Sequence, residues 1–373
     1  MLRNILNIIL FMILAVGILF SSHYFVYLTL VKIFRLEALR AKTLLALLLF
    51  LLPVSYILSS ILAHYVENGF SRFLYFATGL WLGLLTTLVV AFFFSWIIFA
   101  LTSLIGWKIG MNLIGSVALA LAIGYSTYGI WNAYHPEVKN ITVELKNLPE
   151  SWQGKKVVQI SDVHLGHVLR KDFFAKIVKD INDQKPEAVF ITGDLFDGMG
   201  DDFDYMVEEL NAIEAPQGVY FITGNHETYF GLDKVSQIIS KTKLKAFQDN
   251  MEKVNGLQII GINFPERSSQ KNVGEIIKNI PGYDPDGPSV LLFHSPTQIE
   301  AAKNAGVKLQ LSGHTHRGQI YPFNLITHLV YHGYDYGLKT SGDYSIYTSC
   351  GAGVWGPTMR TDCKPEIVSI TLR

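Results

Sequence analysis

The first third of the sequence contains four long runs without Asp, Glu, Lys or Arg, at residues 4–31, 43–66, 73–107 and 109–136. Each run exceeds the roughly 20 residues that an α-helix needs to cross the hydrocarbon core of a bilayer. The core of a soluble protein does not produce uncharged runs of this length. The sequence therefore predicts a membrane domain, residues 1–136, with four transmembrane helices at about 5–31, 43–65, 73–104 and 110–132.

The formal net charge of zero combines two oppositely charged parts of the chain. Residues 1–136 hold seven Lys or Arg and two Glu, a net charge of +5, whereas residues 137–373 hold 24 basic and 29 acidic residues, a net charge of −5. A slightly acidic globular part repels the phosphates of a long nucleic acid. We therefore expect the lipid bilayer as a partner and no nucleic acid.

The basic residues of the short loops indicate an orientation in the membrane. The two loops after the first and third spans carry five Lys or Arg. The opposite side carries Arg3 and Arg72, and then Lys139 and Lys146 after the last span. The side richer in Lys and Arg faces the cytoplasm. With four spans, we expect a multi-pass protein of the plasma (inner) membrane whose residues 137–373 lie outside the cytoplasm.

Residues 137–373 alternate between strand-like and helix-like segments, which is typical of an α/β domain. Helical spacing of apolar residues predicts helices at 173–181 and 203–213, and alternation predicts an edge strand at 141–145. Short apolar runs predict further strands at 156–160, 188–192, 219–223, 257–262, 289–293, 308–312, 344–348 and 366–372.

Five of these strands end in polar clusters, and ligand sites of open α/β sheets lie beyond the carboxyl ends of strands. Residues two apart in an extended segment point to the same side, so Asp162 with His164 and His314 with His316 can each present two ligands. Imidazole and carboxylate donors without thiolates suit Mn, Fe, Zn or Co. Taken singly, each residue could be a turn or core residue; together, in this order, they predict a metal site. The clusters are Asp162-x-His164, Gly193-Asp194-x-x-Asp197, Gly224-Asn225-His226-Glu227, His294 and Gly313-His314-Thr315-His316.

This succession of motifs across residues 162–316 resembles the signature of the calcineurin-like metallophosphoesterases. The tail resembles the ending of the membrane-anchored bacterial branch; it includes Gly351, Gly353, Gly356-Pro357, Arg360 and Pro365-Glu366-Ile367. The resemblance implies that residues 137–373 form the phosphoesterase domain, an α/β fold in which two mixed β-sheets form a sandwich flanked by helices.

The resemblance also implies a role for each motif residue. Asp162, His164 and His316 would hold a first metal, Asp194 would bridge both metals, and Asn225, His294 and His314 would hold the second. The expected cofactors are two divalent ions, Mn foremost and Fe, Zn or Co as alternatives. A hydroxide between the metals would attack phosphorus, while His226, oriented by Asp197, would stabilise the transition state or protonate the leaving oxygen. Glu227 would act directly or support a ligand histidine.

Three other features have roles that the sequence leaves open. Arg317 stands where many relatives have glycine, and it would bind an anionic part of the substrate or form a salt bridge at the rim. The aromatic stretch 321–336 would cover the site, touch lipid headgroups or pack beneath a loop. Cys350 and Cys363 could pair in a domain outside the cytoplasm.

The leading hypothesis is a membrane-anchored, metal-dependent phosphohydrolase of the phosphodiesterase or pyrophosphatase type. Its anchor favours a lipid-linked or membrane-surface phosphate as substrate. One alternative is a phosphodiesterase for soluble nucleotides. Another is a membrane sensor that only binds metal and phosphate, against which the intact His226 counts.

Overall fold

The computed structural model describes residues 2–198, 203–266 and 271–373. Contacts between Cα atoms divide the chain into two compact units. A helical unit comprises Met1–Ile130 and Gly356–Met359, and an α/β unit comprises Trp131–Trp355 and Arg360–Arg373.

The first unit contains the four long apolar helices that the uncharged runs predict, so this part of the predicted fold is confirmed. All four are long and apolar enough to cross a membrane. At 1.5 Å per residue, the 36 residues of α3 extend over about 54 Å, more than a bilayer core requires. The helices are α1 (Leu2–Ile33), α2 (Leu39–Tyr65), α3 (Gly69–Leu104) and α4 (Met111–Ala133).

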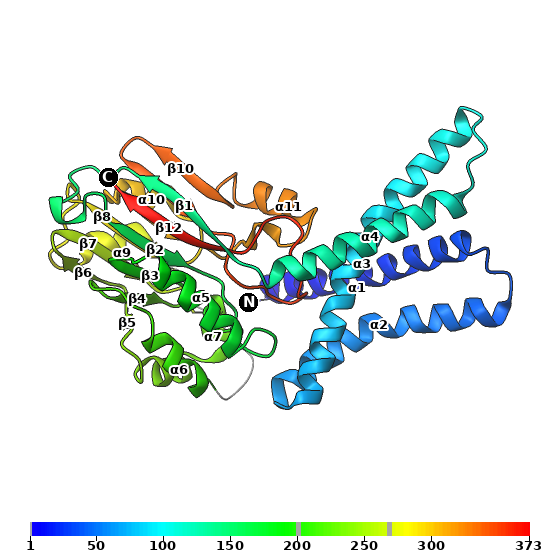
Figure 1. Ribbon diagram of the computed structural model, residues 1–373, viewed down its shortest axis with the longest axis horizontal. Helices are drawn as coiled ribbons and strands as arrows, with labels where there is room; N and C mark the ends of the chain where they lie inside the picture. Colours follow the sequence, from blue (N-terminus) through cyan, green and yellow to red (C-terminus); the bar gives the residue numbers. More distant parts are fainter. Residues whose placement is uncertain (1, 199–202, 267–270) are drawn as a thin grey trace. The chain divides into compact units, whose positions relative to one another are not determined.

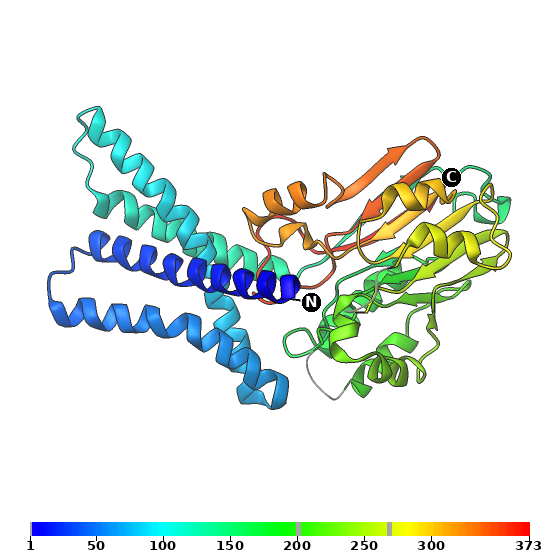
Figure 2. The same ribbon diagram turned by 180° about the vertical axis from the view of Figure 1, so that it is seen from behind.

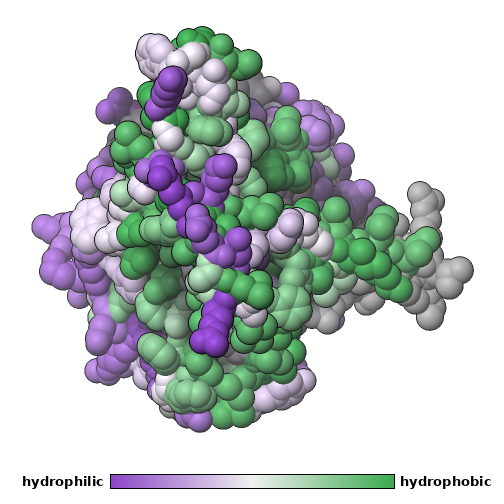
Figure 3. Space-filling view, turned by 90° about the vertical axis from the view of Figure 1, so that its right-hand side faces the viewer, coloured by the Kyte–Doolittle hydropathy of each residue, from purple (hydrophilic) through white to green (hydrophobic). Residues whose placement is uncertain are grey.

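The helices direct apolar side chains outward and enclose a few hydrogen-bonded polar groups. In Figure 3, hydrophobic residues make up much of the surface turned toward the viewer, and a strip of hydrophilic residues crosses its middle. Inside, the Trp81 indole donates to His23 Nε2 at 3.0 Å, and the hydroxyls of Thr87 and Ser126 lie 2.7 Å apart. These bonds satisfy groups that hydrocarbon would leave without a partner.

The second unit contains two six-stranded mixed sheets, as the predicted fold requires (Figure 1). Sheet 1 has the order β1 (Glu137–Val143), β12 (Glu366–Leu372), β2 (Lys156–Ile160), β3 (Ala188–Thr192), β4 (Val219–Ile222) and β5 (Lys245–Ala246). Sheet 2 has the order β10 (Gly337–Ser341), β11 (Tyr344–Thr348), β9 (Leu309–Ser312), β8 (Ser289–Phe293), β7 (Leu257–Ile262) and β6 (Asn250–Val254).

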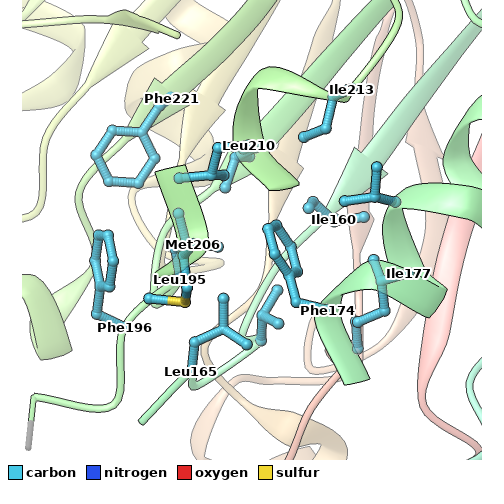
Figure 4. Close-up of a cluster of buried hydrophobic side chains, with 14 of the residues drawn as sticks. Ile160, Leu165, Phe174, Ile177, Leu195, Phe196, Met206, Leu210, Ile213 and Phe221 are labelled. Carbon is cyan, nitrogen blue, oxygen red and sulfur yellow. The ribbon is translucent and has the colours of Figure 1, made fainter. Parts of the chain in front are cut away.

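Helices cover the outer faces of both sheets (Figures 1 and 2). On sheet 1, side chains of α5 and α6 join strand residues in one apolar cluster, which includes Phe174, Leu210 and Ile160 (Figure 4). A second cluster fills the space between the sheets and includes Phe190 and Leu292. The helices are α5 (Lys171–Asp183), α6 (Asp204–Asn211), α7 (Asn225–Phe230), α8 (Leu232–Ile239), α9 (Val273–Asn279), α10 (Ile299–Asn304) and α11 (Phe323–Val330), with 3-10 turns η1 (Glu150–Trp152) and η2 (His316–Gly318).

The strand directions bring the polar clusters together. Strands β2, β3 and β4 are mutually parallel in sheet 1, and β8 and β9 are parallel in sheet 2. Their carboxyl ends carry the five motifs. The predicted edge strand begins and ends earlier than 141–145, because residues 137–143 pair with β12.

Candidate metal centre

The backbone at the strand ends is bent sharply. Asp162, His164 and Asp194 each have φ of 51°, His314 has 74° and His316 has 48°. This left-handed region costs of order 1–3 kcal/mol for a residue other than glycine, and such conformations cluster at functional sites. The expectation of an extended segment at Asp162 and His164 is therefore wrong, because consecutive tight turns, not strand alternation, bring their side chains to one place.

The first motif meets the last one at a group of three buried side chains, Asp162, His164 and His316, whose candidate ligand atoms lie within 4.8 Å of one another. His164 Nε2 and His316 Nε2 are 3.0 Å apart, and His316 Nε2 is 3.4 Å from Asp162 Oδ1. These are the three residues expected around a first metal.

A second group combines Asp194, His294 and His314, also within 4.8 Å. His294 Nε2 lies 3.1 Å from Asp194 Oδ2 and 3.1 Å from the Asn225 side-chain oxygen. The other ring nitrogen, Nδ1, donates to the Thr192 carbonyl at 2.8 Å, which leaves Nε2 directed at the group. The four residues expected around a second metal thus lie together.

Asp194 connects the two groups. Its Oδ2 is 3.1 Å from His294 Nε2 in the second group and 3.9 Å from His164 Nε2 in the first. Its Oδ1 accepts a hydrogen bond from the His226 backbone amide at 2.9 Å, which fixes the carboxylate. A carboxylate in this place suits a ligand shared by two cations.

The acidic and basic side chains of the site shift one another's pKa values. Burial opposes both charges, but the mutual attraction of Asp194 and His294 lowers the pKa of Asp194 and raises that of His294 to about 10. Burial and the charge of His294 lower the pKa of His314 to about 3, and burial with the neighbouring His164 and Arg360 charges places that of His316 well below its ordinary value. Neutral imidazoles and ionised carboxylates are the forms that bind metals, so a metal ion beside His294 would replace the proton that Asp194 now stabilises there.

His226 borders both groups. Its Nδ1 lies 2.7 Å from the Asp197 backbone carbonyl, and because a carbonyl only accepts, Nδ1 carries the proton. The Asp197 carboxylate is farther away, at 4.0 Å from this nitrogen and 3.5 Å from His164 Nδ1. Burial raises the pKa of Asp197 to about 7. Asp197 therefore positions His226 through its main chain, whereas its carboxyl group faces His164, a candidate ligand.

Glu227, for which the sequence left two roles open, is fully buried and fastens two motifs together. Its carboxylate accepts hydrogen bonds from the backbone amides of Asp194 at 2.9 Å, Phe196 at 3.0 Å and Gly224 at 2.6 Å. Burial and the charge of Asp194 raise its pKa to about 7. These bonds support a positioning role.

Glycines allow the strands to approach at the site. Gly193 has φ of 91°, and a Cβ atom there would lie 2.6 Å from His294 Nδ1 and 2.8 Å from the Gly224 amide. A Cβ atom on Gly313 would collide with Ser161 and the Asp162 carboxylate. Larger residues would push ligands apart at both positions.

Arg360, which the sequence placed only in the family-like tail, is a residue of the site. Its guanidinium is fully buried and bonds to His316 Nδ1 at 3.0 Å, the Cys350 carbonyl at 2.6 Å and the Gly353 carbonyl at 2.8 Å. It ties a ligand ring to the C-terminal loop, 44 residues away along the chain. Only tertiary structure reveals such a contact.

The remaining candidates lie at the rim. Arg317 is paired with Asp362, with Nε to Oδ2 at 3.1 Å, and its guanidinium lies 4.8 Å from the Tyr336 ring centroid. The structure thus contains the rim salt bridge, and substrate binding by Arg317 stays a prediction. Cys350 and Cys363 are buried free thiols.

Comparisons with known proteins agree with this geometry. The family model of the calcineurin-like phosphoesterases matches residues 155–318. An uncharacterized metallophosphoesterase of Helicobacter pylori is 32% identical over 254 residues, 67% of this chain and 68% of the relative. One of Campylobacter jejuni is 33% identical over 244 residues, 64% of this chain and 63% of the relative. A transmembrane protein with metallophosphoesterase domain of Danio rerio is 28% identical over 271 residues, 69% of this chain and 62% of the relative.

Proposed function

The chain belongs to the calcineurin-like metallophosphoesterases, and from this membership we propose that it is a membrane-anchored phosphohydrolase that uses two divalent ions. It cleaves a phosphoester or pyrophosphate bond of a lipid-linked or membrane-surface substrate. The observation that carries the proposal is the position of Asp194, whose Oδ2 faces ligand groups on both sides, 3.1 Å from His294 and 3.9 Å from His164.

Each residue has a task in this proposal. Asp162, His164 and His316 hold one ion, Asn225, His294 and His314 hold the other, and Asp194 is shared. When bound, two such ions would make an attacking water more acidic and would neutralise charge on the phosphoryl group.

His226 donates a proton to the leaving group. Burial and the neighbouring His164 lower the pKa of His226. The negative charge of a bound phosphate favours the protonated ring, and a proton on Nε2 is then available to the leaving oxygen. The Asp197 carbonyl holds Nδ1, so that Nε2 is the atom that exchanges the proton.

A chelation experiment tests the proposal. Protein purified in detergent and stripped with EDTA is expected to lose hydrolysis of bis(p-nitrophenyl) phosphate and to regain it with Mn²⁺. His226→Ala is expected to keep its metal content, measured by mass spectrometry, while turnover falls by about 10²-fold or more. Full activity after stripping would contradict the metal dependence, and loss of metal from His226→Ala would make His226 a ligand.

We also propose that the catalytic unit lies outside the cytoplasm, at the plasma (inner) membrane. The support is the excess of Lys and Arg in the loops after the first and third spans. A reporter that is active only outside the cytoplasm, fused after Arg373, is expected to be active. A cytoplasmic signal from the same fusion would reverse the orientation.

A further inference from the structure

An ordinary surface helix turns its apolar side toward the core. Helix α11 is also amphipathic, but its apolar side is exposed. None of its residues is buried. At 3.6 residues per turn, its apolar residues lie along one side, an arc of about 160°. These are Phe323, Leu325, Ile326, Leu329 and Val330, with exposed fractions from 45% to 75%.

The polar side of α11 is fastened to the protein. His328 Nδ1 is 3.0 Å from Asp335 Oδ1, and the Thr327 hydroxyl is 3.4 Å from Oδ2 of the same carboxylate. The Asp335 carbonyl accepts a hydrogen bond of 2.6 Å from Thr315, which stands between the ligands His314 and His316. The apolar side is therefore a fixed surface beside the metal centre.

The surroundings of α11 are neutral and aromatic. Residues 318–338 contain no Lys or Arg, and their single acid, Asp335, is buried. Tyrosines stand at 321, 331, 334 and 336. Tyrosine is enriched at membrane–water interfaces, where its ring is apolar and its hydroxyl reaches water. Nothing in this segment would bring an exposed charge into a bilayer.

Exposed apolar side chains of the α/β unit are concentrated around the site. Trp355 is 52% exposed with its ring centroid 5.6 Å from that of His226, and Tyr229 is 50% exposed at 5.4 Å. Among described residues after Trp131, the other exposed large hydrophobic side chains are those of α11, Tyr321 and Leu338. Soluble surfaces rarely gather apolar groups in this way unless something covers them.

The short link between α4 and β1 indicates that a bilayer covers this surface. Only residues 134–136 separate the end of α4 from the start of β1. Three residues span at most about 11 Å. With four membrane-spanning helices before this link, the catalytic unit is held close to a bilayer.

We infer that the apolar side of α11 lies in the bilayer interface, and that the substrate is consequently a lipid phosphate whose acyl chains stay in the membrane while its phosphate reaches His226. The inference rests on the proposed function and adds its substrate class. Helices that lie in the interface bury one apolar side among headgroups and acyl chains in this manner.

Spin labelling of the full chain in phosphatidylcholine vesicles tests the location of α11. The native thiols are buried, so a label reports on Leu329→Cys, with Lys253→Cys on the exposed side of β6 as the control. The label at 329 is expected to collide with oxygen more than with a water-soluble nickel chelate, and the label at 253 to show the reverse. Water-like accessibility at 329, or shielding from both reagents by a second copy of the chain, would overturn the inference.

Substrate preference supplies the second test. Leu329→Asp is expected to lower kcat/KM at least about tenfold for the p-nitrophenyl phosphodiester of dioleoylglycerol in vesicles, with hydrolysis of bis(p-nitrophenyl) phosphate unchanged. Lys253→Asp, on the exposed side of β6, is expected to change neither rate. Equal activity of Leu329→Asp on both substrates would overturn the inference. Failure of the native protein to hydrolyse the soluble diester would count against the proposed function instead, and the spin-label result would still be interpretable.

Discussion

The helical unit and the α/β unit, which carries the candidate metal centre, differ in how their buried polar groups are paired. Among the described residues up to Ile130, no buried side-chain nitrogen or oxygen lacks a hydrogen-bond partner. In the catalytic unit, His164 Nδ1 and Asp197 Oδ1 lie 3.5 Å apart at the site and neither has such a partner.

The difference distinguishes buried polar groups that stabilise the fold from buried polar groups that serve the site. The buried groups of the helices are hydroxyls, an indole and an imidazole that satisfy one another, and they stabilise packing. The buried groups at the strand ends are ionisable and crowded, which costs stability unless a ligand compensates. Substitutions should therefore affect catalysis in one unit and folding in the other.

The largest effect is expected from Asp194→Ala, which removes the carboxylate between the two ligand groups. Since bound metal contributes several kcal/mol to transition-state stabilisation, turnover is expected to fall by about 10³-fold or more. Metal content per chain, measured by mass spectrometry, is expected to fall with it. Retention of two ions in the variant would show that Asp194 is not shared.

A smaller effect is expected from Glu227→Gln. Three backbone N–H groups now donate to the two carboxylate oxygens of Glu227, whereas a glutamine side chain has a single acceptor oxygen. Residues that support ligands typically change metal affinity about 10–100-fold. Metal titration of the variant against Glu275→Gln, an exposed glutamate of α9, measures this change. Unchanged affinity with reduced turnover would instead give Glu227 a direct role.

The smallest effect is expected from Thr87→Ala in the helical unit, which removes the bond to Ser126. Such interhelical bonds contribute about 0.6 kcal/mol on average. The unfolding free energy in detergent is expected to fall by this amount with turnover unchanged. Thr127→Ala is the matched control, because the Thr127 hydroxyl bonds only to a carbonyl of its own helix. A loss of activity in Thr87→Ala would break the comparison between the units.

The sequence predicted the parts of the fold that depend on local pattern. Uncharged runs located all four helices, and the strands at 156–160, 188–192 and 289–293 have the predicted bounds. Strands β5, β6 and β10 were not predicted, because β5 has two residues and β6 and β10 are polar and largely exposed.

The motif residues were predicted to lie together, and they do, but contacts between distant segments were not predictable. No local pattern indicates that Arg360 reaches His316 or that the Asp197 carboxylate faces His164. The aromatic stretch after Gly318 shows why local pattern does not predict which surface a helix contacts. Helical periodicity identifies an apolar side, but it does not say whether that side faces a core or a bilayer, and α11 leaves it exposed.

The short link at residues 134–136 has a kinetic consequence. An enzyme held this close to a bilayer meets a lipid substrate by lateral diffusion in two dimensions. Its rate would then depend on the mole fraction of substrate in the membrane, and dilution with inert lipid would slow it at constant bulk concentration. The rate of hydrolysis of a substrate dissolved in water would not change when inert lipid is added.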